Sequence, residues 1–193
     1  MIKAIIFDYY GVLTTDRYFT WLRRNPEVAR RHTAAIEALS REQDAGLDAD
    51  TFFSRLADIA HESAASVRDE FNIHGVEHEA LLEYIASLRQ LGLKTAILSN
   101  STAAGLQAEV ERHHLAGVFD VILSSGEAGV IKPDPAIFKL VLNRLAAEAH
   151  EAVFVDDRDY NVRGAAAAGL TALEYDGLAG LRRELERLGI KAG

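Results

Sequence analysis

Cysteine is absent from the 193 residues of the chain, and methionine and tryptophan occur once each. The lack of cysteine excludes disulfide bonds, zinc sites built on thiolates and a thiol nucleophile. Positive charge is also scarce, because 21 lysines and arginines stand against 29 aspartates and glutamates and the formal net charge is −8. This deficit argues against a nucleic-acid partner. A phosphorylated substrate would need local positive charge or a bound cation.

Long apolar runs are absent as well. No stretch is long enough to span a bilayer. A strand pattern begins at residue 2, with no basic stretch followed by a long apolar run, so we expect no signal peptide. We therefore expect no membrane partner and a cytoplasmic location, with which the lack of cysteine is compatible. The length and the hydrophobic content of 49% suit one main core with a small accessory module.

Strands and helices alternate through most of the sequence, which predicts an α/β fold with a parallel sheet covered on both faces. Residues 3–7 form an apolar run without alternation, which is typical of a strand buried on both faces. Apolar patterns predict further strands over 94–98, 119–124, 152–155 and 171–175. Helical spacing and caps predict helices over 79–90, 102–113, 135–147, 160–168 and 177–188.

Residues 15–78 interrupt this alternation with helical patterns and no strand pattern. Asn25-Pro26 is a typical helix start, and Asp48 precedes another helix with an apolar stripe. We therefore divide the chain into a core, residues 1–14 and 79–193, and a helical insertion, residues 15–78. The insertion follows the first strand directly and is a candidate lid over a site there. The alternative is a group of helices that only completes the core.

Polar side chains follow four of the predicted strands, at the point where each strand ends. They are Asp8 after the first strand, Ser99 and Asn100 after the second, Lys132 after the third, and Asp156 and Asp157 after the fourth. A parallel sheet brings these ends together, and ligands bind there. Carboxylates held close together repel one another unless a lysine or a metal ion neutralises them, and oxygen ligands alone suit Mg²⁺. A hydroxyl with a lysine suits a phosphate.

Each of these residues could also serve only a turn or a helix cap, but their order and spacing resemble the haloacid dehalogenase-like hydrolase superfamily. The matching motifs are Phe7-Asp8-x-x-Gly11-Val12-Leu13, Leu98-Ser99-Asn100, Lys132-Pro133-Asp134-Pro135-x-Ile137-Phe138 and Phe154-Val155-Asp156-Asp157-x-x-x-Asn161. The resemblance covers the whole core. It implies a Rossmann-like, doubly wound parallel sheet with a small helical cap inserted after the first strand.

The resemblance also implies a role for each matching position. Asp8 would attack phosphorus and become an aspartyl phosphate. Ser99 would donate a hydrogen bond to the phosphoryl group, and Lys132 would neutralise charge on the nucleophile and the phosphate. Asn100 would orient the substrate or the loop at Tyr10. The implied activity is the hydrolysis of a small phosphorylated metabolite.

Magnesium is the cofactor that the resemblance implies. Its ligands would be Asp8, the backbone carbonyl of Tyr10 and Asp157, with Asp156 acting through water or orienting the site. The sequence carries no signal for the natural substrate or for the oligomeric state.

Tyr10 departs from the phosphatase pattern, because phosphatases of this superfamily usually carry a second aspartate at this position. That aspartate protonates the leaving group and then activates water. A phenol with a pKa near ~10 is a poor base at neutral pH, and the lost acid–base help is worth about 10²–10⁴-fold in rate. Asp16, Glu127 and Asp159 are candidate substitutes.

Two alternatives to the phosphatase follow from this departure. A tyrosine at position 10 also resembles the metal-free haloacid dehalogenases, but these have small polar residues where this chain has Asp156 and Asp157. Two further negative charges without a metal would disfavour a haloacid anion. The second alternative is a non-catalytic member that binds a metal or a partner, since the missing acid–base group could mean lost turnover.

Overall fold

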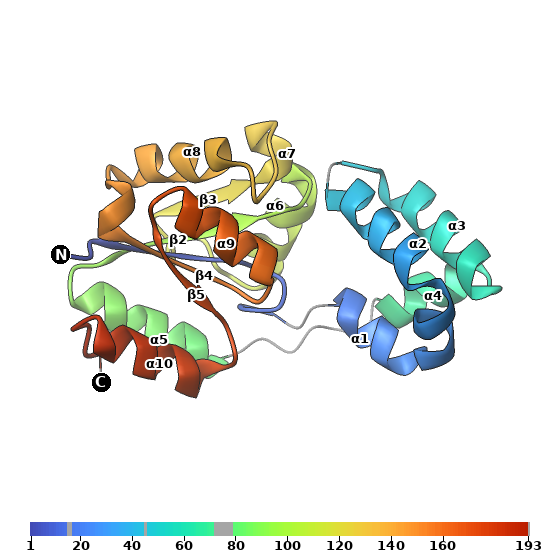
Figure 1. The fold of residues 1–193 in the computed structure, drawn as a ribbon, viewed down its shortest axis with the longest axis horizontal. Coiled ribbons are helices and arrows are strands. Elements are labelled where there is room, and N and C mark those ends of the chain that lie inside the picture. Colours follow the sequence, from blue (N-terminus) through green and yellow to red (C-terminus); the bar gives the residue numbers. More distant parts are fainter. Residues whose placement is uncertain (15–16, 45, 72–78, 193) are drawn as a thin grey trace.

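The structure, a computed structural model, describes residues 1–14, 17–44, 46–71 and 79–192, which form an α/β core and a bundle of helices (Figure 1). The strands are β1 Ala4–Phe7, β2 Lys94–Ser99, β3 Val121–Ser124, β4 Ala152–Asp156 and β5 Thr171–Glu174. The helices of the bundle are α1 Arg17–Arg24, α2 Pro26–Asp44, α3 Ala49–Ala60 and α4 Ala64–Phe71. Those of the core are α5 Glu79–Gln90, α6 Ala103–Arg112, α7 Ser125–Ala128, α8 Pro135–Leu145, α9 Asp159–Ala167, α10 Leu178–Arg187 and the short 3₁₀ helix η1 Ala149–Glu151.

The strands form one parallel sheet in the order β3-β2-β1-β4-β5. The chain runs from the central β1 outward through β2 and β3, then returns to the other side of β1 to add β4 and β5. Strand order therefore reverses between β1 and β4, and such a switch point opens a crevice at the carboxyl ends of the strands. The predicted α/β fold with a doubly wound parallel sheet is confirmed.

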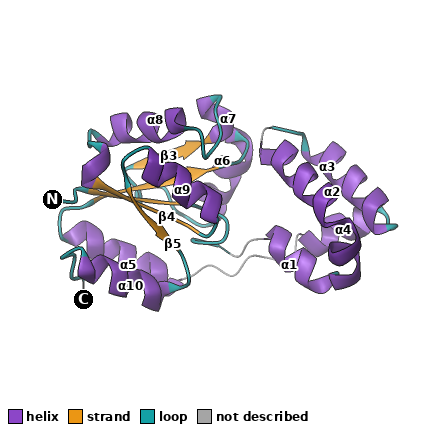
Figure 2. Cartoon of the chain, in the orientation of Figure 1, coloured by secondary structure: helices purple, strands orange, loops and turns teal. Residues whose placement is uncertain are grey.

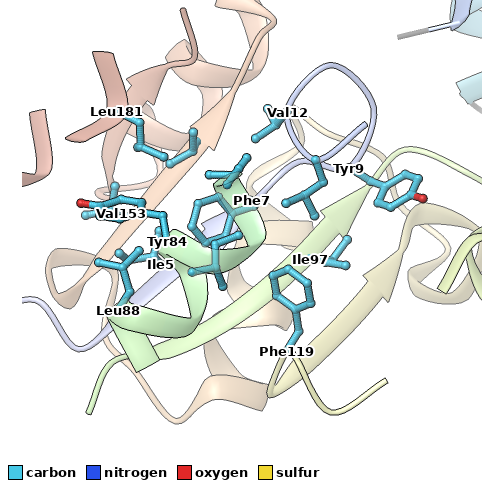
Figure 3. Packing of buried hydrophobic residues seen from close by; sticks show 14 of the residues in the cluster. Ile5, Phe7, Tyr9, Val12, Tyr84, Leu88, Ile97, Phe119, Val153 and Leu181 are labelled. Atoms are coloured by element: carbon cyan, nitrogen blue, oxygen red, sulfur yellow. The ribbon is translucent and has the colours of Figure 1, made fainter. Parts of the chain in front are cut away.

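Side chains of the central strands alternate between two apolar cores, one on each face of the sheet. Ile5 and Phe7 of β1 point into a core formed with α5 and α10, where Tyr84, Leu88 and Leu181 are buried (Figure 3). The neighbours of Ile5 and Phe7 along β1 point into a second core, formed with α8 and α9. Helices therefore cover both faces of the sheet (Figure 2), which explains why the strand sequences are apolar throughout.

The insertion contains more helices than the sequence pattern indicated. The sequence pattern predicted helices that begin near Asn25 and Asp48, and these are α2 and α3. The Asp48 side chain caps α3 by accepting a hydrogen bond from Thr51 N at 2.9 Å. Helices α1 and α4 were not predicted, because each has only eight residues and therefore shows little periodicity, although Ser63 Oγ caps α4 by accepting a hydrogen bond from Ser66 N at 3.1 Å. In the core, α7 was missed because it has only four residues.

Helices α1 to α4 pack around an apolar cluster of their own, which includes Trp21, Phe52 and Phe71. Phe71 lies at its centre, with its ring centroid 6.0 Å from that of Trp21 and 5.9 Å from that of Phe52. The exact borders of the two units stay a prediction, since residues 15–16 and 72–78 lie outside the described ranges. Among the helices of the described residues, none is long and apolar enough to cross a membrane.

Helix α9 packs tightly on the loop that carries Lys132. A Cβ atom placed on Gly164 would lie 2.4 Å from Pro133 Cβ and 2.9 Å from Pro133 O. Neither atom belongs to a flexible side chain, so a larger residue at position 164 must push helix and loop apart. Gly164 therefore stands in the helix because of this contact, although alanine has the higher helix propensity.

We expect Gly164→Ala to lower the free energy of unfolding by about 1–3 kcal/mol, because overpacking of a close contact outweighs the gain in helix propensity. Arg163→Ala is the matched control, since Arg163 is exposed one position away on the same helix. Urea denaturation of both variants measures the difference. A more stable Gly164→Ala protein would contradict the packing of α9 on Pro133.

Candidate active site

The carboxyl ends of β1 and β4 bring Asp8 and Asp156 to one level of the sheet, and Ser99 of β2 lies one residue further along. Phe7 of β1 pairs with Ile97 of β2 and with Val155 of β4. Asp8 follows Phe7 directly, and its backbone N–H still donates to Val155 O at 2.9 Å. Asp8 therefore extends the ladder by one residue and lies beside the end of β4, where Asp156 is the last residue.

Lys132 forms the centre of the site. Its Nζ lies 2.8 Å from Asp8 Oδ1 and 2.7 Å from Asp156 Oδ2, so that one ammonium group binds two carboxylates. All three side chains are almost inaccessible, with exposed fractions of 2% for Lys132, 6% for Asp8 and 0% for Asp156. The ammonium also lies 5.4 Å from the centre of the Phe154 ring. Buried charges of this kind persist only when they are paired.

Burial raises the pKa of Asp8 well above its usual value, and the negative charge of Asp156 raises it further, while Lys132 opposes both effects. For Lys132, burial lowers the pKa, but the charges of Asp156 and Asp8 and the hydrogen bonds to them outweigh burial and raise it. Lys132 is therefore a permanent cation at neutral pH. For Asp8, by contrast, the positive charge of Lys132 does not compensate for burial and for the charge of Asp156, so its pKa stays raised.

Asn100 holds the Lys132 loop. The backbone N–H of Lys132 donates to Asn100 Oδ1 at 2.8 Å, and Asn100 Nδ2 donates to Lys132 O at 3.1 Å. This pair of hydrogen bonds links the end of β2 to the loop after β3. From the sequence we expected Asn100 to orient the substrate or the Tyr10 loop; in the structure its amide is bound to the backbone of Lys132.

Asp156 is held by groups at the start of α9. The Arg158 backbone N–H donates to Asp156 Oδ1 at 2.8 Å. Asn161 Nδ2 lies 3.2 Å and 3.1 Å from the two oxygens of Asp156. Asn161 ends the motif that begins at Phe154, but no role was predicted for it from the sequence. The signal that could have identified it is its position in the first turn of the helix that follows β4.

Asp157 completes a group of three carboxylates with Asp8 and Asp156, in which one ligand oxygen of each lies within 4.8 Å of the others. Gly11 makes room for it, because a Cβ atom on Gly11 would lie 2.3 Å from Asp157 Oδ2, and its φ of +91° also favours glycine. The donor set consists of oxygen atoms alone. This chemistry fits a hard cation such as Mg²⁺.

Ser99 ends β2 beside this group. Its side chain has an exposed fraction of 0%, and its Oγ has no hydrogen-bond partner among the described residues. Buried hydroxyl groups are almost always satisfied in native proteins. A hydroxyl that lacks a partner at the edge of the sheet is suited to bind a ligand, which agrees with its predicted role toward a phosphoryl group.

Tyr10, which replaces the expected aspartate, packs its ring edge-on against Tyr9 with 4.9 Å between the ring centroids. It is half-buried against the apolar core below β1. Tyr9 is in turn held by a hydrogen bond from its hydroxyl to the buried Glu109 at 3.3 Å, and its backbone N–H donates to Asp8 Oδ1 at 2.7 Å. The two tyrosines thus support the loop that carries Asp8 from the core side. A metal bond from the Tyr10 carbonyl stays a prediction.

The three candidate substitutes for the missing acid differ in position. Glu127 belongs to α7 and accepts a hydrogen bond from Arg144 at 2.7 Å. Asp159 begins α9 and lines the groove described below. Asp16 lies outside the described residues.

A groove of about 810 Å³ lies between α2 of the bundle and the carboxyl edge of the sheet. Lys132, Asp157 and Arg158 line it on the side of the core, and one face of α2 lines it on the other. The groove therefore begins at two of the residues of the carboxylate and lysine cluster and extends under the helical insertion. A substrate could place its reacting group at the cluster and the rest of its body in the groove.

Comparison with known proteins supports this arrangement at the level of the family. Residues 2–169 match the family of haloacid dehalogenase-like hydrolases. A phosphatase of Mycobacterium tuberculosis is 29% identical over 97% of this chain and 95% of its own length. A (S)-2-haloacid dehalogenase of Burkholderia cepacia is 32% identical over 49% of this chain and 41% of its own length.

Other relatives are much longer than this chain. It spans only 19% and 25% of the length of two proteins to which it is 31% and 30% identical. Among solved structures, a haloacid dehalogenase-like hydrolase of Porphyromonas gingivalis superposes with a TM-score of 0.73 at 23% identity, over 99% of both chains. The sheet order, the residues at its carboxyl edge and the match over residues 2–169 together assign the chain to the haloacid dehalogenase-like hydrolases.

Proposed function

We propose that the protein is a Mg²⁺-dependent phosphatase that hydrolyses small phosphomonoesters through an aspartyl phosphate on Asp8. The observation that carries this proposal is the buried cluster in which Lys132 binds Asp8 and Asp156 next to Asp157. One lysine among three carboxylates leaves an excess of negative charge, which a divalent cation would offset. When bound, Mg²⁺ would supply positive charge that stabilises the phosphoryl group in the transition state.

Asp8 supplies the nucleophile. Lys132 Nζ and the Tyr9 N–H both bind Asp8 Oδ1, at 2.8 and 2.7 Å, so Oδ2 is the oxygen that these donors leave for attack. Oδ2 forms a bond to phosphorus while the bond from phosphorus to the leaving oxygen breaks. Water then attacks the phosphorus of the aspartyl phosphate, which releases phosphate and restores the carboxylate.

Ser99 and Lys132 stabilise the charge that spreads over the phosphoryl oxygens. The Ser99 hydroxyl has no partner among the described residues and can donate to one of these oxygens without breaking an existing bond. Lys132 is held in place by Asn100 and by two carboxylates, so that its charge is oriented before the substrate binds. Preorganised charge of this kind is the main contribution of a protein to phosphoryl transfer.

A metal-free dehalogenase is the main alternative, because Tyr10 resembles that group and a dehalogenase is among the relatives. The cluster argues against it. A haloacid is itself an anion and would have to approach Asp8, Asp156 and Asp157 with Lys132 as the buried cation between two of them. A non-catalytic role is the second alternative, and it would be excluded by measured turnover of a substrate.

We expect hydrolysis of an activated aryl phosphate to require both Mg²⁺ and Asp8. Asp8→Asn should abolish turnover because the amide is not a nucleophile, and a chelator should abolish it in the unaltered protein. Asp58→Asn, an exposed substitution in α3, is the control and should retain activity. Phosphate release measures all three. Turnover that persists with Asp8→Asn or in chelator would contradict the proposal.

We expect Lys132→Met to lower the free energy of unfolding by about 3–5 kcal/mol, because it leaves two buried carboxylates without their counter-charge. Lys139→Met removes an exposed lysine of α8 and serves as the matched control, with a much smaller effect. Denaturation in urea at neutral pH compares the two. Equal stability of both variants would show that the Lys132 ion pairs do not contribute the predicted amount to the free energy of unfolding.

We expect turnover to depend strongly on the leaving group, because position 10 lacks a carboxylic acid. Tyr10→Asp should raise the hydrolysis of an alkyl phosphate by about 10²-fold and change that of an activated aryl phosphate much less. Tyr10→Phe, which keeps the ring and removes the hydroxyl, is the control and should leave both rates unchanged. A large loss of alkyl phosphate hydrolysis with Tyr10→Phe would instead identify the phenol as the acid.

A further inference from the structure

One face of α2 forms the wall of the groove on the side of the bundle. Ala29, Thr33, Ile36 and Ser40 recur at the spacing of a helix along this wall. Three of the four are small, which keeps the groove wide in front of the helix. The Thr33 hydroxyl donates to Ala29 O at 2.6 Å, so it is bound to the helix itself. These four residues therefore present mainly carbon atoms, beside the charged Arg30, Glu37 and Arg41 of the same helix.

The opposite wall comes from the core, where apolar side chains lie among charged ones. Ile131 and Pro133 flank Lys132 in the loop after β3, and Tyr160 lies in the first turn of α9. Tyr160 has an exposed fraction of 40%, which is unusual for a large aromatic residue beside a buried cluster. Leu22 of α1 adds a further apolar side chain from the bundle. Apolar surface next to the site is thus supplied by four separate segments.

The charged side chains of the groove give no net attraction for a second anion. Apart from Lys132 and Asp157, they are Arg30, Arg41, Arg158, Glu37, Asp159 and Glu174. Basic and acidic residues are balanced in this set. Arg30 also lies 2.6 Å from Glu27, and Arg41 lies 4.0 Å from Glu37, so both arginines already have carboxylate partners. A second phosphate or carboxylate on the substrate would have to compete for them.

We propose that the groove binds a bulky, apolar leaving group, so that the substrate is a phosphomonoester of a hydrophobic alcohol or phenol. This inference rests on the proposed phosphatase function and narrows its substrate class. The phosphate occupies the cluster at Lys132 and Asp157, and the hydrocarbon part lies between α2 and the Tyr160 side of the core. The volume of about 810 Å³ is far more than a phosphate needs and exceeds that of a small polar alcohol.

The test is a series of aryl phosphates in which the hydrocarbon grows but the phenol keeps a nearly constant acidity. We would measure kcat/KM for 4-methyl-, 4-butyl- and 4-octylphenyl phosphate, with acetyl phosphate as a substrate that does not reach the groove. Apolar burial predicts a gain of about 2- to 4-fold in kcat/KM for each methylene until the groove is full. Acetyl phosphate reports the chemistry of the cluster alone.

Two variants locate the effect. Ala29→Phe fills the groove from α2 and should lower kcat/KM for the octyl compound by about 10-fold or more, while hydrolysis of acetyl phosphate stays unchanged. Ala35→Phe is the matched control, because it places the same side chain on an exposed position of α2 that does not line the groove. It should leave both substrates unaffected.

The outcomes separate this inference from the proposed function. Hydrolysis of acetyl phosphate with no gain along the series, or equal effects of Ala29→Phe and Ala35→Phe, would overturn the apolar groove and leave the phosphatase intact. No hydrolysis of any compound would overturn the phosphatase. In that case calorimetry still tests the groove, because 4-octylphenyl phosphate should bind more tightly than 4-methylphenyl phosphate, and Ala29→Phe should remove the difference.

Discussion

The ion pairs between Lys132 and the carboxylates of Asp8 and Asp156 are the interaction on which the rest of the site depends. They join three segments that are far apart in the sequence, and each segment has its own support. Asn100 fixes the backbone of Lys132, and Asn161 fixes the carboxylate of Asp156. The cost of burying these charges is recovered only when all three are in place. This constraint explains why so many polar residues gather at one edge of an otherwise apolar sheet.

The same cluster links the two parts of the chain. It lies at the switch point of the sheet, where the doubly wound order opens a crevice, and the insertion after β1 places α2 over that crevice. In the proposed function, the sheet edge carries the charges that would act on a phosphoryl group, and the helical insertion lines the space for the remainder of the substrate. The balanced charges of the groove and the apolar side chains between them are the basis for proposing a hydrophobic leaving group rather than a second anion.

The sequence predicted the parallel sheet and the level at which the polar residues meet, because apolar runs and strand ends are local signals. It did not predict α1 and α4, which have only eight residues each and show little periodicity. The bond between Asn100 and the Lys132 backbone is a tertiary contact and leaves no pattern along the chain. The reason for Gly164, its contact with Pro133, could be found only from the packing of α9 on the loop.

The central claim is that Asp8 becomes phosphorylated during turnover. The most direct measurement is to mix the protein with an activated aryl phosphate and Mg²⁺, quench in acid and determine the mass of the peptide that contains Asp8. The account predicts that this peptide gains the mass of one phosphoryl group, that the gain disappears in chelator, and that Asp8→Asn never shows it. Release of phosphate without any phosphorylated Asp8 peptide, under conditions in which the quench is faster than turnover, would contradict the account.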